Sequence, residues 1–238
     1  MTSTQELDIA SDKFSWKPAL AATGYFVLLL GVTQALRAVI YQLLFRLLPR
    51  MGVARTEIFW DAISIAAMLL TGVILLIILQ PRAARLGLNW SAASRKERLI
   101  TLAGGALLGV MAAINIALDP SQAIVVLHGC VITPLFEELI FRGWGWGRID
   151  AVLPARWRGW GTLALVTILF GLWHLGYFDV VGLRMAAHPE NSAPLGLILG
   201  MKVVIGLAVG LLTGLARRSS RSVYGSLVIH ALWNLFGR

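Results

Sequence analysis

The stretch Pro134-Leu-Phe-Glu137-Glu138-Leu-Ile-Phe-Arg142-Gly143 places two adjacent carboxylates in an otherwise apolar run. A charged side chain inside a membrane span costs on the order of 3 kcal/mol or more to bury, so such a residue is a candidate functional group by default. Two neighbouring glutamates in one apolar segment therefore mark this stretch as the candidate functional centre of the chain.

The composition around this stretch is that of a membrane protein. The chain has 238 residues, of which 58% are hydrophobic and 14% are charged, and its mean hydropathy is +0.76. Ordinary soluble domains carry about 25% charged residues. We therefore expect an all-α, polytopic transmembrane helix bundle with about seven spans. Residues 1–18 are expected to form a polar cytoplasmic N-terminus, and residues 19–238 a single transmembrane bundle.

Seven apolar segments approach the roughly 20 residues that a bilayer crossing needs. The last has 15 residues, or about 22 Å of helix, against a hydrocarbon core of about 30 Å, so its full crossing is left open. Residues 82–98 are expected to lie on the membrane surface, and residues 177–193 to form a polar loop. The predicted spans are residues 19–36 (with 44 as the alternative end), 58–79, 99–118, 123–141, 160–175, 194–215 and 222–236.

The net charge of +9 comes from Lys and Arg that lie mainly between the apolar segments. There they set topology and contact anionic headgroups, so we expect membrane lipids and no nucleic acid as partners. The positive-inside rule places the N-terminus in the cytoplasm and, with the fourth span ending near Phe141, the active site near the cytoplasmic side of the cell's inner (plasma) membrane. Trp144 and Trp146 are expected in the interfacial aromatic belt.

Helix geometry separates the roles of the two glutamates. Adjacent residues differ by about 100° around a helix, so Glu137 and Glu138 cannot point the same way. Arg142 follows Glu138 by four residues, the spacing at which side chains meet. A Glu138–Arg142 pair leaves Glu137 to face a cavity, where a carboxylate can act as general base for water. The alternative is that both glutamates pair with arginines and stabilise the bundle.

Two further clusters lie on other spans. Residues 170–174 read Phe-Gly-Leu-Trp-His, and residues 230–234 read His-Ala-Leu-Trp-Asn, which puts His230 and Asn234 on one helical face. Together with the glutamates, these groups could hold a water, polarise a carbonyl and stabilise an oxyanion. His128 and His188 have no partner at a telling spacing and are expected to be turn or surface histidines.

The three clusters resemble the CPBP family of intramembrane proteases, which includes the CAAX prenyl endopeptidases and the bacteriocin-processing Abi proteins. The resemblance covers about residues 120–236 and implies hydrolysis of a peptide bond in or at the edge of the membrane. It implies that Glu137 activates the water with His174, that His230 and Asn234 hold the oxyanion, and that Glu138 and Arg142 orient the site. The motifs that carry it are Glu137-Glu138-xxx-Arg142, Phe170-xxx-His174 and His230-xxx-Asn234.

The resemblance leaves the metal open. His174 and His230 could bind zinc, but Asn is a poor zinc ligand, and zinc sites prefer His, Cys and carboxylate. Cys130 is the one cysteine, so a multi-cysteine metal site is excluded. We therefore favour metal-free glutamate catalysis slightly over zinc.

The expected partner is a peptide or protein substrate, with a prenylated C-terminal peptide as one candidate. The rival hypothesis is a catalytically silent membrane scaffold or regulator, or a peptide-toxin immunity protein of the same fold. A proton-coupled transporter is a further alternative, but the internal repeat symmetry that transporters commonly have is not evident in this sequence.

Overall fold

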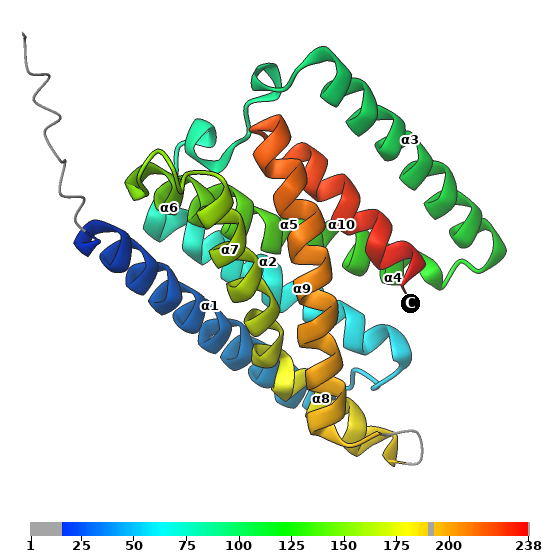
Figure 1. The fold of residues 1–238 in the computed structure, drawn as a ribbon. Helices are drawn as coiled ribbons and strands as arrows, with labels where there is room; N and C mark the ends of the chain where they lie inside the picture. Colours follow the sequence, from blue (N-terminus) through cyan, green and yellow to red (C-terminus); the bar gives the residue numbers. More distant parts are fainter. Residues whose placement is uncertain (1–15, 190–192, 238) are drawn as a thin grey trace, which may run out of the picture.

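A computed structural model of the protein describes residues 16–189 and 193–237, so the polar N-terminus predicted for residues 1–18 lies almost wholly outside the described residues. The described residues form helices and turns without strands, and the predicted all-α polytopic bundle is confirmed (Figure 1). Six helices in this part of the chain are long and apolar enough to cross a membrane. They are α1 (Lys17–Arg50), α2 (Glu57–Leu79), α3 (Arg95–Leu118), Gln122–Val152, Trp160–Ala187 and α9 (Leu195–Ser220).

The seventh predicted segment forms α10 (Tyr224–Phe236), which has 13 residues. At 1.5 Å per residue this helix is about 20 Å long, shorter than a hydrocarbon core of about 30 Å. It packs against α3, α9 and the first half of Gln122–Val152, and Figure 1 shows it lying alongside α3 and α9. The short helix is therefore held by its neighbours within the bundle.

The helix Gln122–Val152, here called the central helix, runs further than the sequence predicted. Its parts are α4 (Gln122–Val126), η3 (Leu127–Ile132), α5 (Thr133–Glu138), η4 (Leu139–Gly145) and α6 (Trp146–Val152), with η3 and η4 π-helical. π-Helical turns are rare and occur frequently at functional sites.

The prediction that this span ends near Phe141 is wrong, and so is the interfacial placement of two tryptophans. Trp144 and Trp146 are buried in the core, and the Trp144 ring lies 5.9 Å from that of Phe26 in α1. Because these residues pack inward, the helix continues beyond them to Val152. Glu137 consequently lies near the middle of the central helix instead of near its end.

The polar loop predicted for residues 177–193 is also wrong. After α7 (Trp160–Trp173), the short turn η5 (His174–Tyr177) leads into α8 (Phe178–Ala187). Asp179 in the first turn of α8 is buried and pairs with Arg37 of α1 at 2.7 Å. This buried ion pair, with apolar packing of Val180 and Leu183, keeps the segment helical against the bundle. The segment predicted to lie on the membrane surface, residues 82–98, contains two short 3₁₀ turns, η1 (Ala83–Leu86) and η2 (Trp90–Ala92).

Glycines bring α7 and α9 together. A Cβ atom at Gly206 would lie 2.7 Å from His174 Nδ1, and one at Gly210 would lie 3.2 Å from Phe170 Cδ1. Gly200, six residues before Gly206 in α9, has open space where its Cβ atom would lie. The close approach of α9 to α7 therefore needs the missing side chains at 206 and 210, and it places α9 directly against His174.

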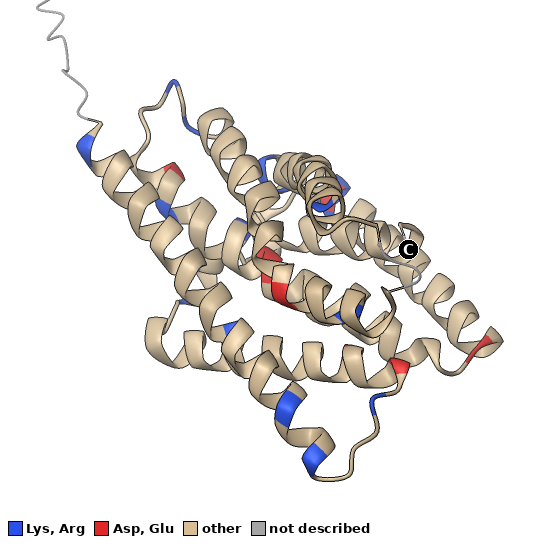
Figure 2. Cartoon of the chain, turned by 90° about the horizontal axis from the view of Figure 1, so that it is seen from below, with Lys and Arg blue, Asp and Glu red and all other residues tan. Residues whose placement is uncertain are grey.

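The charged residues mark the two ends of the bundle. Figure 2 shows Lys and Arg mainly toward the ends of helices and in their connections. Arginines that follow α2, end the central helix and end α9 line shared cavities at the end of the bundle where α1 begins. We call this end the arginine-rich end.

Candidate active site

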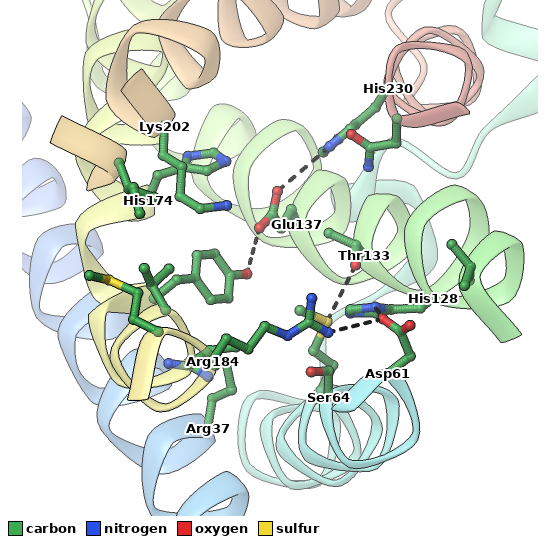
Figure 3. A pocket seen from close by; sticks show the side chains of 18 of the residues that line it. Arg37, Asp61, Ser64, His128, Thr133, Glu137, His174, Arg184, Lys202 and His230 are labelled. Carbon is green, nitrogen blue, oxygen red and sulfur yellow. Dashed lines mark hydrogen bonds and ion pairs between the residues drawn. The ribbon is translucent and has the colours of Figure 1, made fainter. Parts of the chain in front are cut away.

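A cavity of about 720 Å³ lies between α1, α2, the central helix, α8, α9 and α10. Four of the six predicted site residues line it, and the other two, Glu138 and Arg142, are buried behind it. The structure therefore brings the three sequence clusters to one place (Figure 3). The four lining residues are Glu137, His174, His230 and Asn234.

Glu137 is buried, with 1% of its surface exposed, and its two carboxylate oxygens differ in environment. Oε1 accepts hydrogen bonds from Trp173 Nε1 at 2.9 Å and from the Tyr177 hydroxyl at 2.6 Å. Oε2 has no hydrogen-bond partner among the described residues and lies 3.8 Å from His230 Nε2. One oxygen therefore fixes the orientation of the carboxylate, and the other remains available for chemistry.

Glu138 has the partner that the sequence predicted. Its Oε1 accepts from Arg142 Nη1 at 3.1 Å, and both side chains are fully buried. The same oxygen lies 2.9 Å from His230 Nδ1, and Arg142 Nη2 donates to the carbonyl of Gly210 at 2.9 Å. The alternative in which both glutamates pair with arginines does not describe the observed contacts, because Glu137 is held by Trp173 and Tyr177.

His174 is fixed by its own helix. Its Nδ1 lies 2.8 Å from the carbonyl oxygen of Phe170, which can only accept, so Nδ1 carries the proton in this bond. The imidazole packs edge-on against the Phe170 ring, with centroids 5.1 Å apart. The remaining nitrogen, Nε2, is therefore the basic atom of this side chain.

Asn234 lines the cavity one turn beyond His230. Its Nδ2 donates a hydrogen bond of 2.7 Å to the carbonyl of Gly129 in the π-helical turn η3. An amide nitrogen has two protons, so one N–H group of Asn234 remains for another acceptor. The bond to Gly129 ties α10 to the central helix beside the site.

A second layer of residues holds the site, and the sequence reasoning missed it. Arg37 donates to Asp179 at 2.7 Å and to the Gly176 carbonyl at 2.9 Å, and its guanidinium lies 4.8 Å from the centre of the Tyr177 ring. Gln34 donates to the Trp173 carbonyl at 3.0 Å. These contacts anchor the turn whose side chains bind Glu137. The signal in the sequence was Arg37, a charged residue in the first apolar segment that needs a buried partner.

His128 is not the turn or surface residue that the sequence suggested. It lies on the central helix, where its Nδ1 is 2.6 Å from Asp61 Oδ1 of α2, and both side chains line the cavity (Figure 3). Arg184 approaches the same carboxylate at 3.5 Å. His188 is half-exposed and lies 3.5 Å from Glu57, so its predicted surface position holds.

The donors do not form a zinc site in this arrangement. Catalytic zinc usually has three protein ligands, and the described residues contain no group of three or more His, Cys, Asp or Glu side chains placed to hold a metal ion. The Nδ1 atoms of His174 and His230 are bonded to Phe170 and Glu138. These bonds leave Nε2 of each imidazole as the nitrogen that faces a proton, a hydrogen-bond partner or another ligand.

Comparison with known proteins connects this geometry to a family. Residues 119–236 match the family model Rce1-like, described as type II CAAX prenyl endopeptidase Rce1-like. No curated protein and no solved structure matches the chain. The matched segment contains the central helix, both site histidines and Asn234, while α1, α2 and α3 lie outside it. The chain therefore belongs, through residues 119–236, to the Rce1-like family of type II CAAX prenyl endopeptidases, which are intramembrane proteases.

Proposed function

We propose that this integral membrane protein is an active endopeptidase in which Glu137 activates the water that cleaves a peptide bond. The observation that carries the proposal is the asymmetry of the Glu137 carboxylate. Trp173 and Tyr177 hold Oε1, while Oε2 is buried on the cavity side, 3.8 Å from His230, and has no hydrogen-bond partner among the described residues. A fixed carboxylate with one unengaged oxygen is suited to act as a general base.

In the proposed reaction, Glu137 Oε2 takes a proton from water as the water oxygen attacks the carbonyl carbon of the scissile bond. His174 assists through Nε2, its basic nitrogen. The tetrahedral intermediate then collapses as the C–N bond breaks, and the proton carried by Glu137 passes to the leaving amine. General acid–base catalysis of this kind contributes about 10²- to 10⁴-fold in rate.

His230 and Asn234 are placed to stabilise the oxyanion of that intermediate. Glu138 accepts from His230 Nδ1 and is itself held by Arg142, so the other ring nitrogen of His230 points toward Glu137. Asn234 has one amide N–H beyond its bond to Gly129. With Nδ1 donating to Glu138, His230 donates from Nε2 only as the imidazolium, which carries protons on both ring nitrogens; in that form it and Asn234 are donors placed where charge develops in the transition state. Glu138 and Arg142 are thus orienting residues in the proposal.

The proposed substrate is a membrane peptide, with a prenylated C-terminal peptide as the first candidate. An apolar groove of about 170 Å³ runs between α2 and the central helix. Met68 lines both this groove and the active-site cavity. A hydrocarbon chain attached to the peptide could therefore lie in the groove while the peptide occupies the cavity.

We propose that the protein lies in the plasma membrane with its N-terminus, and hence the arginine-rich end, in the cytoplasm, because short cytoplasmic loops carry an excess of Lys and Arg. The exposed residues of the cavity lining, Arg184 and His188, lie at the opposite end of the bundle. In this orientation the cavity opens away from the cytoplasm. The predicted cytoplasmic position of the site depended on a span ending near Phe141, which the structure does not have.

Orientation can be measured independently of activity. A membrane-impermeant maleimide added to intact cells should label His188→Cys at the cavity opening and not Arg156→Cys at the arginine-rich end; the native Cys130 is buried. The reverse labelling would place the cavity opening in the cytoplasm.

The test of the function is cleavage by the purified protein in detergent, with a quenched peptide library that includes prenylated peptides. The wild type should cleave, and Glu137→Ala and His174→Ala should lose cleavage while remaining folded. Glu97→Ala, at a partly exposed position in the first turn of α3 and outside the cavity lining, is the matched control and should retain activity. A scaffold, regulator or immunity protein predicts no cleavage by any of these proteins.

A further inference from the structure

A second cavity, of about 730 Å³, lies at the arginine-rich end of the bundle. None of its lining residues is acidic. The basic groups come from three separate parts of the chain: two from the segment after α2, one from α6 and one from the last turn of α9. These residues are Arg82, Arg85, Arg148 and Arg217.

Two of the four guanidinium groups are held in place by the bundle. Arg148 lies over the Trp144 ring at 4.1 Å and the Tyr25 ring at 5.5 Å, and Arg217 Nε donates to the carbonyl of Arg142 at 2.8 Å. Among the described residues, no carboxylate lies within ion-pair distance of Arg82, Arg85, Arg148 or Arg217. The cavity therefore presents partly preorganised positive charge with no ion-paired carboxylate from the described residues; Asp150, which acts on Arg217 at longer range, lines the neighbouring cavity.

The cavity continues into an apolar surface. Leu79, Pro81 and Trp144 line both this cavity and the groove between α2 and the central helix. The groove runs along exposed apolar side chains such as Leu76, at 51% exposure, and these face the membrane interior in a spanning helix. A cationic cavity at a helix end thus joins an apolar groove that extends toward the middle of the membrane.

We propose that this composite site binds one anionic phospholipid, with its phosphate headgroup among the four arginines and an acyl chain in the groove. Arginine presents several donors in a planar fork that matches phosphate oxygens. Basic pockets between membrane helices bind anionic lipid headgroups such as cardiolipin. A soluble phosphate compound could bind the arginines but has no hydrocarbon chain to fill the groove. The continuity of the cavity and the groove therefore favours a lipid.

The arginine cavity shares no lining residue with the active-site cavity, whereas the groove shares Met68 with it, so a lipid acyl chain and a substrate's hydrocarbon chain would compete for the groove. Arg217 holds the backbone carbonyl of Arg142, and the Arg142 side chain holds Glu138. A headgroup that fixes Arg217 therefore stabilises the central helix beside the site. A ligand that binds the folded state selectively raises its stability, so lipid binding should raise the unfolding temperature even if the protein proves to be no protease.

The experiment measures lipid binding to the delipidated protein in neutral detergent by native mass spectrometry, together with the unfolding temperature. Dioleoyl phosphatidylglycerol and cardiolipin should bind and stabilise the wild type, and dioleoyl phosphatidylcholine should not. Arg85→Gln/Arg148→Gln should weaken anionic-lipid binding about thirtyfold. Each basic residue near an anionic surface contributes about a five- to sixfold gain in affinity, and the double variant loses two of them. The matched control, Arg46→Gln/Arg50→Gln at the other end of α1, should bind like the wild type.

Two further arms identify the ligand. Short-chain dihexanoyl phosphatidylglycerol should bind more weakly than the dioleoyl lipid, because it leaves the groove unfilled. Inorganic phosphate should not displace the dioleoyl lipid at equal concentration. Equal binding of short-chain lipid and phosphate would show a soluble-anion site and overturn the proposal. Equal loss of binding in the Arg46/Arg50 control would show non-specific attraction by net charge, and would overturn it as well.

Discussion

The Nδ1 atom of His230 lies 2.9 Å from Oε1 of Glu138, so the second glutamate of the pair orients a histidine from another helix. Arg142 binds the same oxygen at 3.1 Å. Nε2 of that histidine lies 3.8 Å from Glu137. The two adjacent glutamates therefore lie at opposite edges of one imidazole, and their angular separation on the helix gives them the different surroundings that the proposed roles of base and orienting group require.

The buried Glu138–Arg142 pair should dominate the stability of the central helix. Arg142→Met removes the guanidinium from a fully buried Glu138 and leaves His230 as its remaining partner, and breaking a buried ion pair costs about 3–5 kcal/mol. Thermal unfolding in detergent measures the loss. Arg95→Met, at an exposed position at the start of α3, should change stability by less than about 0.5 kcal/mol. Equal unfolding temperatures for the two variants would contradict the inference that the Glu138–Arg142 pair stabilises the central helix.

Tyr177 should act as a positioning residue for Glu137. Tyr177→Phe removes a 2.6 Å hydrogen bond to the carboxylate but keeps the ring. Hydrogen bonds to charged groups contribute about 1.5–3 kcal/mol, so kcat should fall about 10- to 100-fold with little change in KM. Tyr224→Phe, whose ring packs on Trp90 away from the cavity, provides the comparison. Steady-state kinetics with a cleaved peptide gives both parameters, and an unchanged kcat for Tyr177→Phe would refute this role.

A methyl group at position 206 should displace His174. The Cβ of Gly206→Ala would lie 2.7 Å from His174 Nδ1, the atom that bonds to Phe170. We expect a marked loss of cleavage, since either the imidazole or α9 has to move. Gly200→Ala is the same substitution on the same helix, but the added methyl group would lie in open space. This variant should retain full activity. Comparable activity in both variants would mean that the packing of α9 against His174 is not needed for catalysis.

Cleavage should not require a metal. Because the described residues lack a cluster of three metal-binding side chains, EDTA and 1,10-phenanthroline should leave cleavage by the purified protein unchanged. Elemental analysis of the same sample should find no stoichiometric zinc. Loss of activity on chelation, with recovery on adding zinc, would instead support the zinc alternative.

Much of the fold could be predicted because a helix that crosses a membrane needs a long run of apolar residues, which is visible in the sequence. The Glu138–Arg142 pair was predictable for a similar reason, since a spacing of four within one helix fixes proximity. The ends of the spans were less predictable. Tryptophan serves equally in an interfacial belt and in a core, so Trp144 and Trp146 were assigned to the wrong environment and the central helix was predicted too short.

The contacts that the sequence did not reveal join residues far apart in the chain. His128 and Asp61 lie on different helices and are 67 positions apart in the chain, so no helical spacing links them. Tyr177 lies in the segment that the sequence predicted to be a polar loop. That prediction followed from polar residues such as Asp179, whose buried partner Arg37 lies on another helix and is not evident from the sequence. Proximity of this kind depends on helix packing, which local spacing does not encode.

The π-helical turns on both sides of Thr133–Glu138 have a consequence for length variation in this protein. A π turn holds one residue more than the α turn it replaces, so deleting a single residue between 127 and 132 would convert it to an ordinary turn. Because the π turn absorbs its extra residue, the helix beyond such a deletion would keep its facing, whereas a deletion in an α-helical part would rotate everything beyond it by about 100°. Residues 127–132 are thus a place where the central helix can lose one residue and still present Glu137 to His230.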